Sequence, residues 1–213
     1  MIKEDLANKL VMEKFMILPS NRYVFKICIL GSGGIGKTCY ANRLCFDKYN
    51  DNTKLTIGID FYSYELPIII KNEDSLVSVT IWDFGGQEQF QILFPSYISG
   101  VSGVLMVFSL INMQSLIRLD WWYERLFKNV DKNKVPRVVL GTKYDLIQTA
   151  SEIGSELGPD KINDLVIDQF LYRHDEKDFF RCSSKENYNI SESFKVLIKK
   201  ILDTQNMDYD WIP

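Results

Sequence analysis

The stretch GSGGIGKT, residues 31–38, places four glycines, a lysine and a threonine in a spacing that suits phosphate binding. Glycines let the backbone wrap an anion, and the N-terminus of a following helix presents free N–H groups to it. The stretch fits two patterns at once. The glycines at its first, third and sixth positions fit a dinucleotide-binding loop. The glycines at its first and sixth positions, followed by Lys37 and Thr38, fit a P-loop for nucleoside triphosphates.

The residues that follow favour one of these two patterns. A dinucleotide site needs an acidic residue about 20 positions further on, at the end of a second strand. The sequence there, DKYNDN at residues 47–52, is acidic but typical of a loop. A P-loop needs Lys and then Ser or Thr directly after its last glycine, so that Lys37 reaches the β- and γ-phosphates and Thr38 binds Mg²⁺. We therefore interpret the stretch as a P-loop.

Three further stretches carry groups that suit a guanine nucleotide. In WDFGGQE, Asp83 is placed to organise the Mg²⁺ shell and Gly86 to offer a backbone N–H to a γ-phosphate. In GTKYD, the Asp145 carboxylate would accept hydrogen bonds from the ring N–H and the exocyclic amine of guanine, a pair of donors that adenine lacks. In CSSK, residues 182–185, a backbone N–H would reach the guanine 6-oxygen.

The apolar pattern predicts the elements that position these groups. Strands are expected at 23–30, 57–70, 75–82, 103–111, 135–142 and 178–183, and helices at 37–46, around 116–127 and at 190–201, with residues 71–74 as a hairpin turn. This order predicts an α/β fold of the P-loop NTPase type, a mostly parallel six-stranded sheet with one antiparallel strand and helices on both faces. Ligands of such folds bind beyond the carboxyl ends of the strands, where all four stretches lie.

Composition excludes several classes of protein. The chain has 213 residues, of which 46% are apolar and 25% charged, and its net charge of -3 gives no reason to expect nucleic acid as a partner. Four cysteines without a C-x-x-C pair favour a reducing, cytoplasmic environment. No run of 18 apolar residues and no N-terminal secretion signal occur in the sequence.

The four stretches, in this order and each at the end of a strand, resemble the Ras superfamily of small GTPases over residues 22–203. The resemblance implies a Mg²⁺-dependent switch that binds GTP or GDP, hydrolyses GTP slowly, and has effector, exchange-factor and activating proteins as partners. It implies that Thr56 binds Mg²⁺ only in the presence of a γ-phosphate and that Gln87 orients the attacking water. It also implies that Tyr49 packs on the guanine and that Lys143 packs along it.

The expected nucleotide site joins the phosphate loop, the switch residues and the base-binding loops. Its residues are Gly31, Ser32, Gly33, Gly34, Ile35, Gly36, Lys37, Thr38, Cys39, Tyr49, Thr56, Asp83, Gly86, Thr142, Lys143, Asp145, Ser183, Ser184 and Lys185, with Gln87 as the catalytic residue and Thr38 and Thr56 as metal ligands. Residues 47–55 contain no arginine, so we expect an activating arginine to come from a partner. The alternatives are a nucleotide-bound scaffold that does not hydrolyse, and an ATP-dependent enzyme such as a kinase.

The resemblance does not single out one branch of the superfamily. TIGIDF, which contains Thr56, is most similar to the Rab branch, a branch of vesicle trafficking. Thr142, in place of the common asparagine, and a lengthened stretch between Asp145 and Ser183 are similar to the Rho branch. WDxGGQ resembles Arf and Roc domains. We expect the lengthened stretch to hold an extra or longer helix.

The two ends lie outside the expected G domain, residues 22–203. Residues 1–21 predict an amphipathic helix that docks on its own domain, with a membrane-surface or partner helix as the alternative. Residues 204–213 form a tail without the cysteines of prenylated relatives, and Ile2 excludes N-myristoylation. We therefore expect a cytoplasmic protein, and peripheral membrane association stays open.

Four side chains outside the motifs also carry expectations. His174, the only histidine, is expected at the surface or at a helix end. Trp122 continues the apolar stripe of its helix and is expected in the core, whereas Trp121 lies off the stripe and is either partly buried or a partner contact. Phe84 is either part of a partner surface or a packed switch residue.

Overall fold

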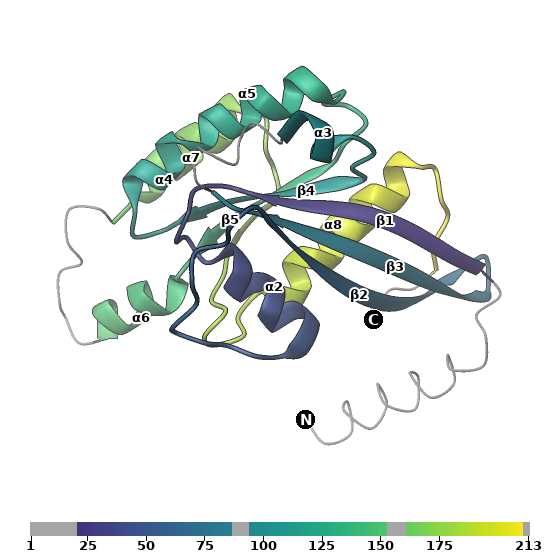
Figure 1. Ribbon diagram of the computed structural model, residues 1–213, viewed down its shortest axis with the longest axis horizontal. Coiled ribbons are helices and arrows are strands. Elements are labelled where there is room, and N and C mark those ends of the chain that lie inside the picture. Colours follow the sequence, from purple (N-terminus) through teal and green to yellow (C-terminus); the bar gives the residue numbers. More distant parts are fainter. Residues whose placement is uncertain (1–20, 87–93, 153–160, 211–213) are drawn as a thin grey trace.

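Six strands form one sheet in the computed structural model, which describes residues 21–86, 94–152 and 161–210 (Figure 1). The strands are β1 (Asn21–Leu30), β2 (Ile59–Ile70), β3 (Glu73–Phe84), β4 (Gly103–Ser109), β5 (Arg137–Thr142) and β6 (Phe179–Arg181). They lie in the order β2-β3-β1-β4-β5-β6, and every pair is parallel except β2 and β3. The predicted fold class is therefore confirmed, including its single antiparallel strand.

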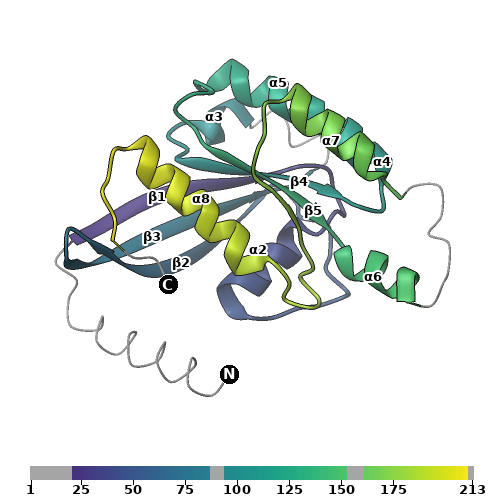
Figure 2. The ribbon, with the colours of Figure 1, turned by 180° about the vertical axis from the view of Figure 1, so that it is seen from behind.

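Helices cover both faces of this sheet (Figure 2). One face carries α2 (Lys37–Phe46) and α8 (Ile190–Thr204), and the other carries α3 (Phe94–Ile98), α4 (Met113–Ile117), α5 (Leu119–Asn129) and α7 (Asp164–Arg173). The remaining helix, α6 (Tyr144–Glu152), follows the carboxyl end of β5. Two helices thus occupy the lengthened stretch between β5 and β6. No helix of the described ranges is long and apolar enough to cross a membrane.

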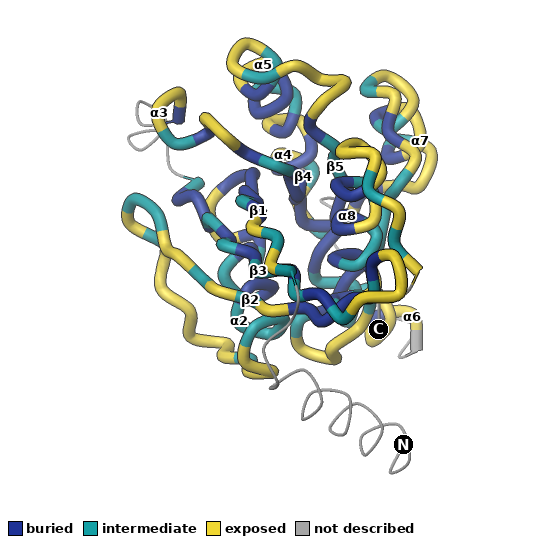
Figure 3. The backbone as a smooth tube through the Cα atoms, turned by 90° about the vertical axis from the view of Figure 1, so that its right-hand side faces the viewer, coloured by how far each residue is buried: buried dark blue, intermediate teal, exposed yellow. Residues whose placement is uncertain are grey.

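The core consists of two apolar clusters, one on each face of the sheet. All seven residues of β4 are buried because helices cover both of its faces, which is why its sequence is continuously apolar (Figure 3). The expected stripe on α8 is buried against the sheet, from Ile190 through Phe194 to Ile201. This burial fixes the strands as a rigid frame, and the loops at their carboxyl ends take their positions from it.

Two local predictions need correction. The hairpin turn is not four residues long, because Ile70 pairs directly with Glu73. Lys71 and Asn72 alone form the turn, with φ of 52° and 61°, as a two-residue turn between twisted strands requires. The single helix expected around 116–127 is divided at Arg118, which ends α4 and precedes α5.

The side chains outside the motifs fall mainly in the interior. Trp122 is buried in the core as expected, and Trp121 is partly buried with its ring edge-on to Trp122. Phe84 is buried against Phe94, so the packed alternative is correct. His174 ends α7 and lies 2.5 Å from an Asp120 oxygen through Nε2, which agrees with a role at a helix end.

The carboxyl-terminal segment folds back on the sheet. Met207 and Tyr209 pack against the core cluster that includes α8. The Asp210 N–H donates to the carbonyl of Ile69 at 2.8 Å, and its carboxylate accepts from the Asn72 N–H at 2.8 Å. The helix predicted for residues 1–21 falls, except for Asn21, outside the described residues, and the proposed division into an extension, a G domain and a tail stays a prediction.

Candidate functional site

The loop between β1 and α2 opens the N-terminus of α2 toward a pocket. Gly36 precedes the helix with a φ of +99°, a left-handed conformation that residues with a Cβ rarely adopt. No described side chain caps the helix at this end. The N–H groups of the first turn are therefore available to an anion, as the P-loop pattern predicts.

Lys37, the first residue of α2, turns back across this loop. Its ammonium group donates to the carbonyls of Gly31 at 2.9 Å and Ser32 at 2.7 Å, and only 6% of the residue is exposed. Burial lowers the pKa of Lys37 to about 8, and the nearby charge of Asp83 opposes this change. The lysine therefore lies beside the anion site with its charge weakly compensated.

Three oxygen-bearing side chains meet next to Lys37, where the loop, residue 56 and β3 converge. The Thr38 and Thr56 hydroxyls lie 2.9 Å apart. One carboxylate oxygen of Asp83, Oδ2, accepts from Thr38 and lies 3.4 Å from the Thr56 hydroxyl. Burial raises the pKa of the fully buried Asp83 carboxyl, whereas Lys37 lowers it.

This cluster fits a small divalent cation. The other Asp83 oxygen, Oδ1, is buried and has no hydrogen-bond partner among the described residues. Within those residues no group of three His, Cys, Asp or Glu side chains could hold a metal. A cation here would therefore rely on hydroxyl and carboxylate oxygens and on oxygens of a ligand, the donor set that Mg²⁺ uses when it binds phosphates.

The carboxyl end of β5 carries the candidate base-binding residues. The Thr142 hydroxyl lies 2.5 Å from the carbonyl of Ile35 and 3.0 Å from that of Phe108, so it ties the phosphate loop to β4. Lys143 has a φ of 63°, a conformation that a non-glycine residue keeps only when its surroundings hold it. Asp145 is half-buried, and its Oδ1 accepts from the Ser183 hydroxyl at 2.7 Å.

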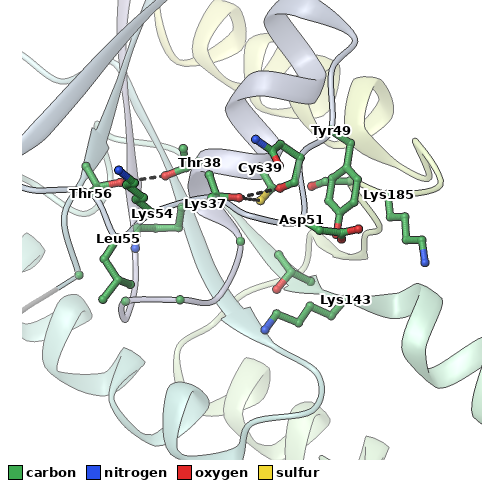
Figure 4. A pocket seen from close by; sticks show the side chains of 18 of the residues that line it. Lys37, Thr38, Cys39, Tyr49, Asp51, Lys54, Leu55, Thr56, Lys143 and Lys185 are labelled. Carbon is green, nitrogen blue, oxygen red and sulfur yellow. Dashed lines mark hydrogen bonds between the residues drawn. The ribbon is translucent and has the colours of Figure 1, made fainter.

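These groups line one pocket of about 340 Å³. Figure 4 shows Thr38 and Thr56 at one end of it and Tyr49, Asp51 and Lys185 at the other. The expected site residues that line it are Gly33, Gly34, Gly36, Lys37, Thr38, Cys39, Tyr49, Thr56, Gly86, Thr142, Lys143, Asp145, Ser184 and Lys185. Five other expected residues are buried and do not line the pocket, namely Gly31, Ser32, Ile35, Asp83 and Ser183. Gln87 lies outside the described residues.

Sequence reasoning missed several residues of the pocket wall. These are Asn50, Asp51, Thr53, Lys54, Leu55 and Leu146. A hydrogen bond with Asp51 raises the pKa of Tyr49, and the Leu55 side chain lies over Gly34 of the phosphate loop. Five of the six belong to one loop that has no apolar periodicity, so position relative to Thr56 was the only signal available for them.

Two segments flank the pocket opening, residues 55–58 around Thr56 and residues 84–86 after Asp83. They contact each other and the phosphate loop. The Gly85 N–H donates to the Gly58 carbonyl at 2.8 Å. Gly86 lies directly against the phosphate loop, because a Cβ added to it would overlap the backbone of Ser32 and Gly33 and lie 2.6 Å from the carbonyl oxygen of Gly31. Leu55 on one segment and Gly86 on the other both lie against the phosphate loop, so residues 55–58 and 84–86 are both closed over it.

Comparisons with known proteins agree with this arrangement. A family model described as Ras family matches residues 26–203. Ras-related protein Rab7 of Glycine max is 31% identical over 188 residues, which cover 87% of this chain and 85% of that protein. Ras-related protein RABG3b of Arabidopsis thaliana is 32% identical over 184 residues, 85% of each chain. The Ypt/Rab-type GTPase avaA of Emericella nidulans is 29% identical over 184 residues, 85% of this chain and 83% of its own length.

Proposed function

The chain belongs to the Ras family of small GTPases, and we propose that it is a Mg²⁺-dependent switch that binds GTP and GDP and hydrolyses GTP to GDP and phosphate. The observation that carries the proposal is that one pocket joins three features. It unites an open helix N-terminus, the cluster of Thr38, Thr56 and Asp83, and the Asp145 carboxylate. A Mg²⁺-bound guanine nucleotide makes use of all three.

The phosphate end of the pocket would hold the β- and γ-phosphates. Backbone N–H groups from residues 33–38 would donate to phosphate oxygens, and the Lys37 ammonium would exchange its carbonyl acceptors for them. The Thr38 and Thr56 hydroxyls would act as metal ligands, and the Asp83 carboxylate would orient them by hydrogen bonds. Bound Mg²⁺ supplies positive charge that offsets the charge of the phosphates.

The base end of the pocket would select guanine. Asp145 would accept two hydrogen bonds from the base, while Tyr49 and Lys143 would pack against its ring. The Ser183 hydroxyl holds the Asp145 carboxylate in place, so that the carboxylate does not need to reorient when the base arrives. ATP offers this carboxylate no pair of donors, which argues against a kinase.

Hydrolysis would switch the two closed segments. Gln87 would orient a water molecule for in-line attack on the γ-phosphate, and Thr56 and Gly86 would contact that phosphate. Loss of the γ-phosphate removes both contacts, so both segments would relax. Effector, exchange-factor and activating proteins would read or control this change, as the Rab proteins among the relatives suggest, in a cytoplasmic or peripheral membrane setting of vesicle traffic.

Single-turnover GTP hydrolysis tests the proposal against the scaffold alternative. We expect slow hydrolysis by the purified chain, and a further loss of roughly tenfold or more in Gln87→Leu with GTP affinity retained, because the water loses its orienting group. Gln91→Leu, a nearby glutamine outside the motif, is the matched control. Equal rates for the protein and Gln87→Leu would favour a nucleotide-bound scaffold, and a fast intrinsic rate would contradict the need for an arginine from a partner.

A proton-linkage measurement tests the role of Lys37. Its pKa of about 8 in the phosphate-free pocket should rise when phosphate oxygens surround it, so binding of Mg²⁺-GDP should take up protons at about pH 8.5 and far fewer at about pH 7. Affinity should accordingly fall as pH rises through about 8. Calorimetry in two buffers of different ionisation enthalpy measures the uptake. Lys54→Ala removes an exposed lysine of the same pocket and should still show the proton uptake. If the unmodified protein takes up no protons on binding, Lys37 does not have this role.

A further inference from the structure

Arg43 belongs to the last turn of α2, and its side chain lies between the helix and the loop that follows β6. Its side chain is only 14% exposed. The guanidinium donates to the carbonyl of Ser184 at 2.8 Å through Nε and to that of Lys185 at 3.2 Å through Nη2. Through Nη1 it donates to the carbonyl of Asp47 at 3.0 Å and to its carboxylate at 2.8 Å. One planar group thus joins the phosphate-binding helix, the start of the loop that carries Tyr49, and the base-binding loop.

The hydrogen bonds that Tyr188 and Arg43 make to two carbonyls determine where the neighbouring N–H groups point. A peptide unit is planar and trans, so its C=O and its N–H point in opposite directions. The Ser183 carbonyl accepts from the Tyr188 N–H at 2.9 Å, and the Ser184 carbonyl accepts from Arg43. The N–H groups of Ser184 and Lys185 belong to these two units, and they therefore face away from Tyr188 and Arg43. Neither N–H donates to another described residue.

The rest of the loop is fixed without Arg43. Ser183 is bound on both sides by Tyr188, and its hydroxyl both donates to Asp145 and accepts from the Glu186 N–H at 3.1 Å. The Ser184–Lys185 peptide has no such internal partner in the described chain. The guanidinium of Arg43 is planar and binds two successive carbonyls, so it orients this peptide. A flexible lysine would not hold the peptide in the same way.

We propose that Arg43 is a positioning residue for base recognition, which orients the N–H group of Lys185 toward the 6-oxygen of guanine, beside the N–H group of Ser184 that Tyr188 orients. The proposal rests on the proposed function, because it assumes that the base lies at this end of the pocket. Asp145 and Arg43 then govern different edges of the base. Asp145 reads the ring N–H and the exocyclic amine, and Arg43 acts through the loop on the 6-oxo group.

Nucleotide analogues separate the two effects. In 6-thio-GDP a sulfur, which is a weak acceptor, replaces the 6-oxygen, while the donors read by Asp145 remain. IDP keeps the 6-oxygen but lacks the exocyclic amine. We expect the full-length protein to prefer GDP to 6-thio-GDP by about tenfold, the worth of one good hydrogen bond, and Arg43→Ala to lose most of that preference. The preference for GDP over IDP should be the same in both proteins.

Two further variants keep the test decisive. Arg43→Lys, which can reach only one carbonyl, should recover part of the preference and covers the case in which Arg43→Ala does not fold. Arg22→Ala, an exposed arginine at the far end of β1 paired with Glu65, is the matched control and should behave as the unmodified protein. If Arg43→Ala weakens all three nucleotides by the same factor, or none, the proposal is wrong. Failure of the unmodified protein to bind GDP would instead overturn the proposed function.

Discussion

Asp145→Asn is expected to transfer the preference of the pocket from guanine to xanthine nucleotides. The carboxylate would accept from two donors of guanine, whereas an asparagine amide presents one donor and one acceptor, which suit the 2-oxo group and the ring N–H of xanthine. Each charge-assisted hydrogen bond contributes about 1.5–3 kcal/mol, so the loss of both lowers GDP affinity by roughly 10²- to 10⁴-fold. Because Asp145 is half-buried, the lower end of that range is the better expectation.

Competition between fluorescent GDP and unlabelled GDP, XDP and ADP measures this change. Asp145→Ala should lose GDP affinity without gaining XDP affinity, which separates a change of specificity from a damaged pocket. Asp168→Asn, an exposed aspartate on α7, is the matched control. If ADP competes as well as GDP in the unmodified protein, Asp145 does not select guanine and the base assignment is wrong.

Gly86→Ala is expected to slow GTP hydrolysis by roughly 10²-fold while changing GDP affinity little. The added methyl group would overlap the backbone of Ser32 and Gly33, and the phosphate loop cannot move aside without giving up its own contacts. The segment after β3 must therefore shift outward by about 1 Å, and Gln87, the next residue, shifts with it. A displacement of that size at a reacting group costs about 10²-fold in rate.

Single-turnover hydrolysis with bound GTP and separate titration with GDP distinguish the two effects. Gly100→Ala is the control, because a Cβ there meets no described atom within 4 Å and reports only the backbone cost of a glycine with a φ of +71°. Hydrolysis at the unmodified rate in Gly86→Ala would mean that the segment does not lie against the phosphate loop when GTP is bound.

The parts of the site that sequence predicts well are those fixed by a strand end. Asp83 lies at the carboxyl end of β3, and Asp145 lies three residues after β5 ends. Parallel strands bring their carboxyl ends to one edge of the sheet, so the order of the elements alone places both residues near the phosphate loop. Thr142 departs from the family asparagine, yet its hydroxyl still binds the carbonyl of Ile35. The pattern therefore identified the position, although the residue differs.

The parts that sequence does not predict depend on how loops close. Lys54 and Leu55 line the pocket only because their loop folds over Gly34, and nothing in their spacing indicates this. Arg43 looks like any polar residue on a helix until the loop after β6 is placed beside it. Ser183 was expected on the pocket wall, but its backbone is taken up by Tyr188, so it supports Asp145 from behind.

The hydrogen bond between Gly85 and Gly58 makes the two closed segments one cooperative unit. A ligand shifts a conformational equilibrium only by the difference in its affinity for the two states. If Thr56 on one segment and Gly86 on the other contact the γ-phosphate, as proposed, the shared bond would add these two contacts into a single equilibrium. A partner protein that touches only one segment would then respond to the phosphate contacts of both, and intermediate states with one segment open would be depleted.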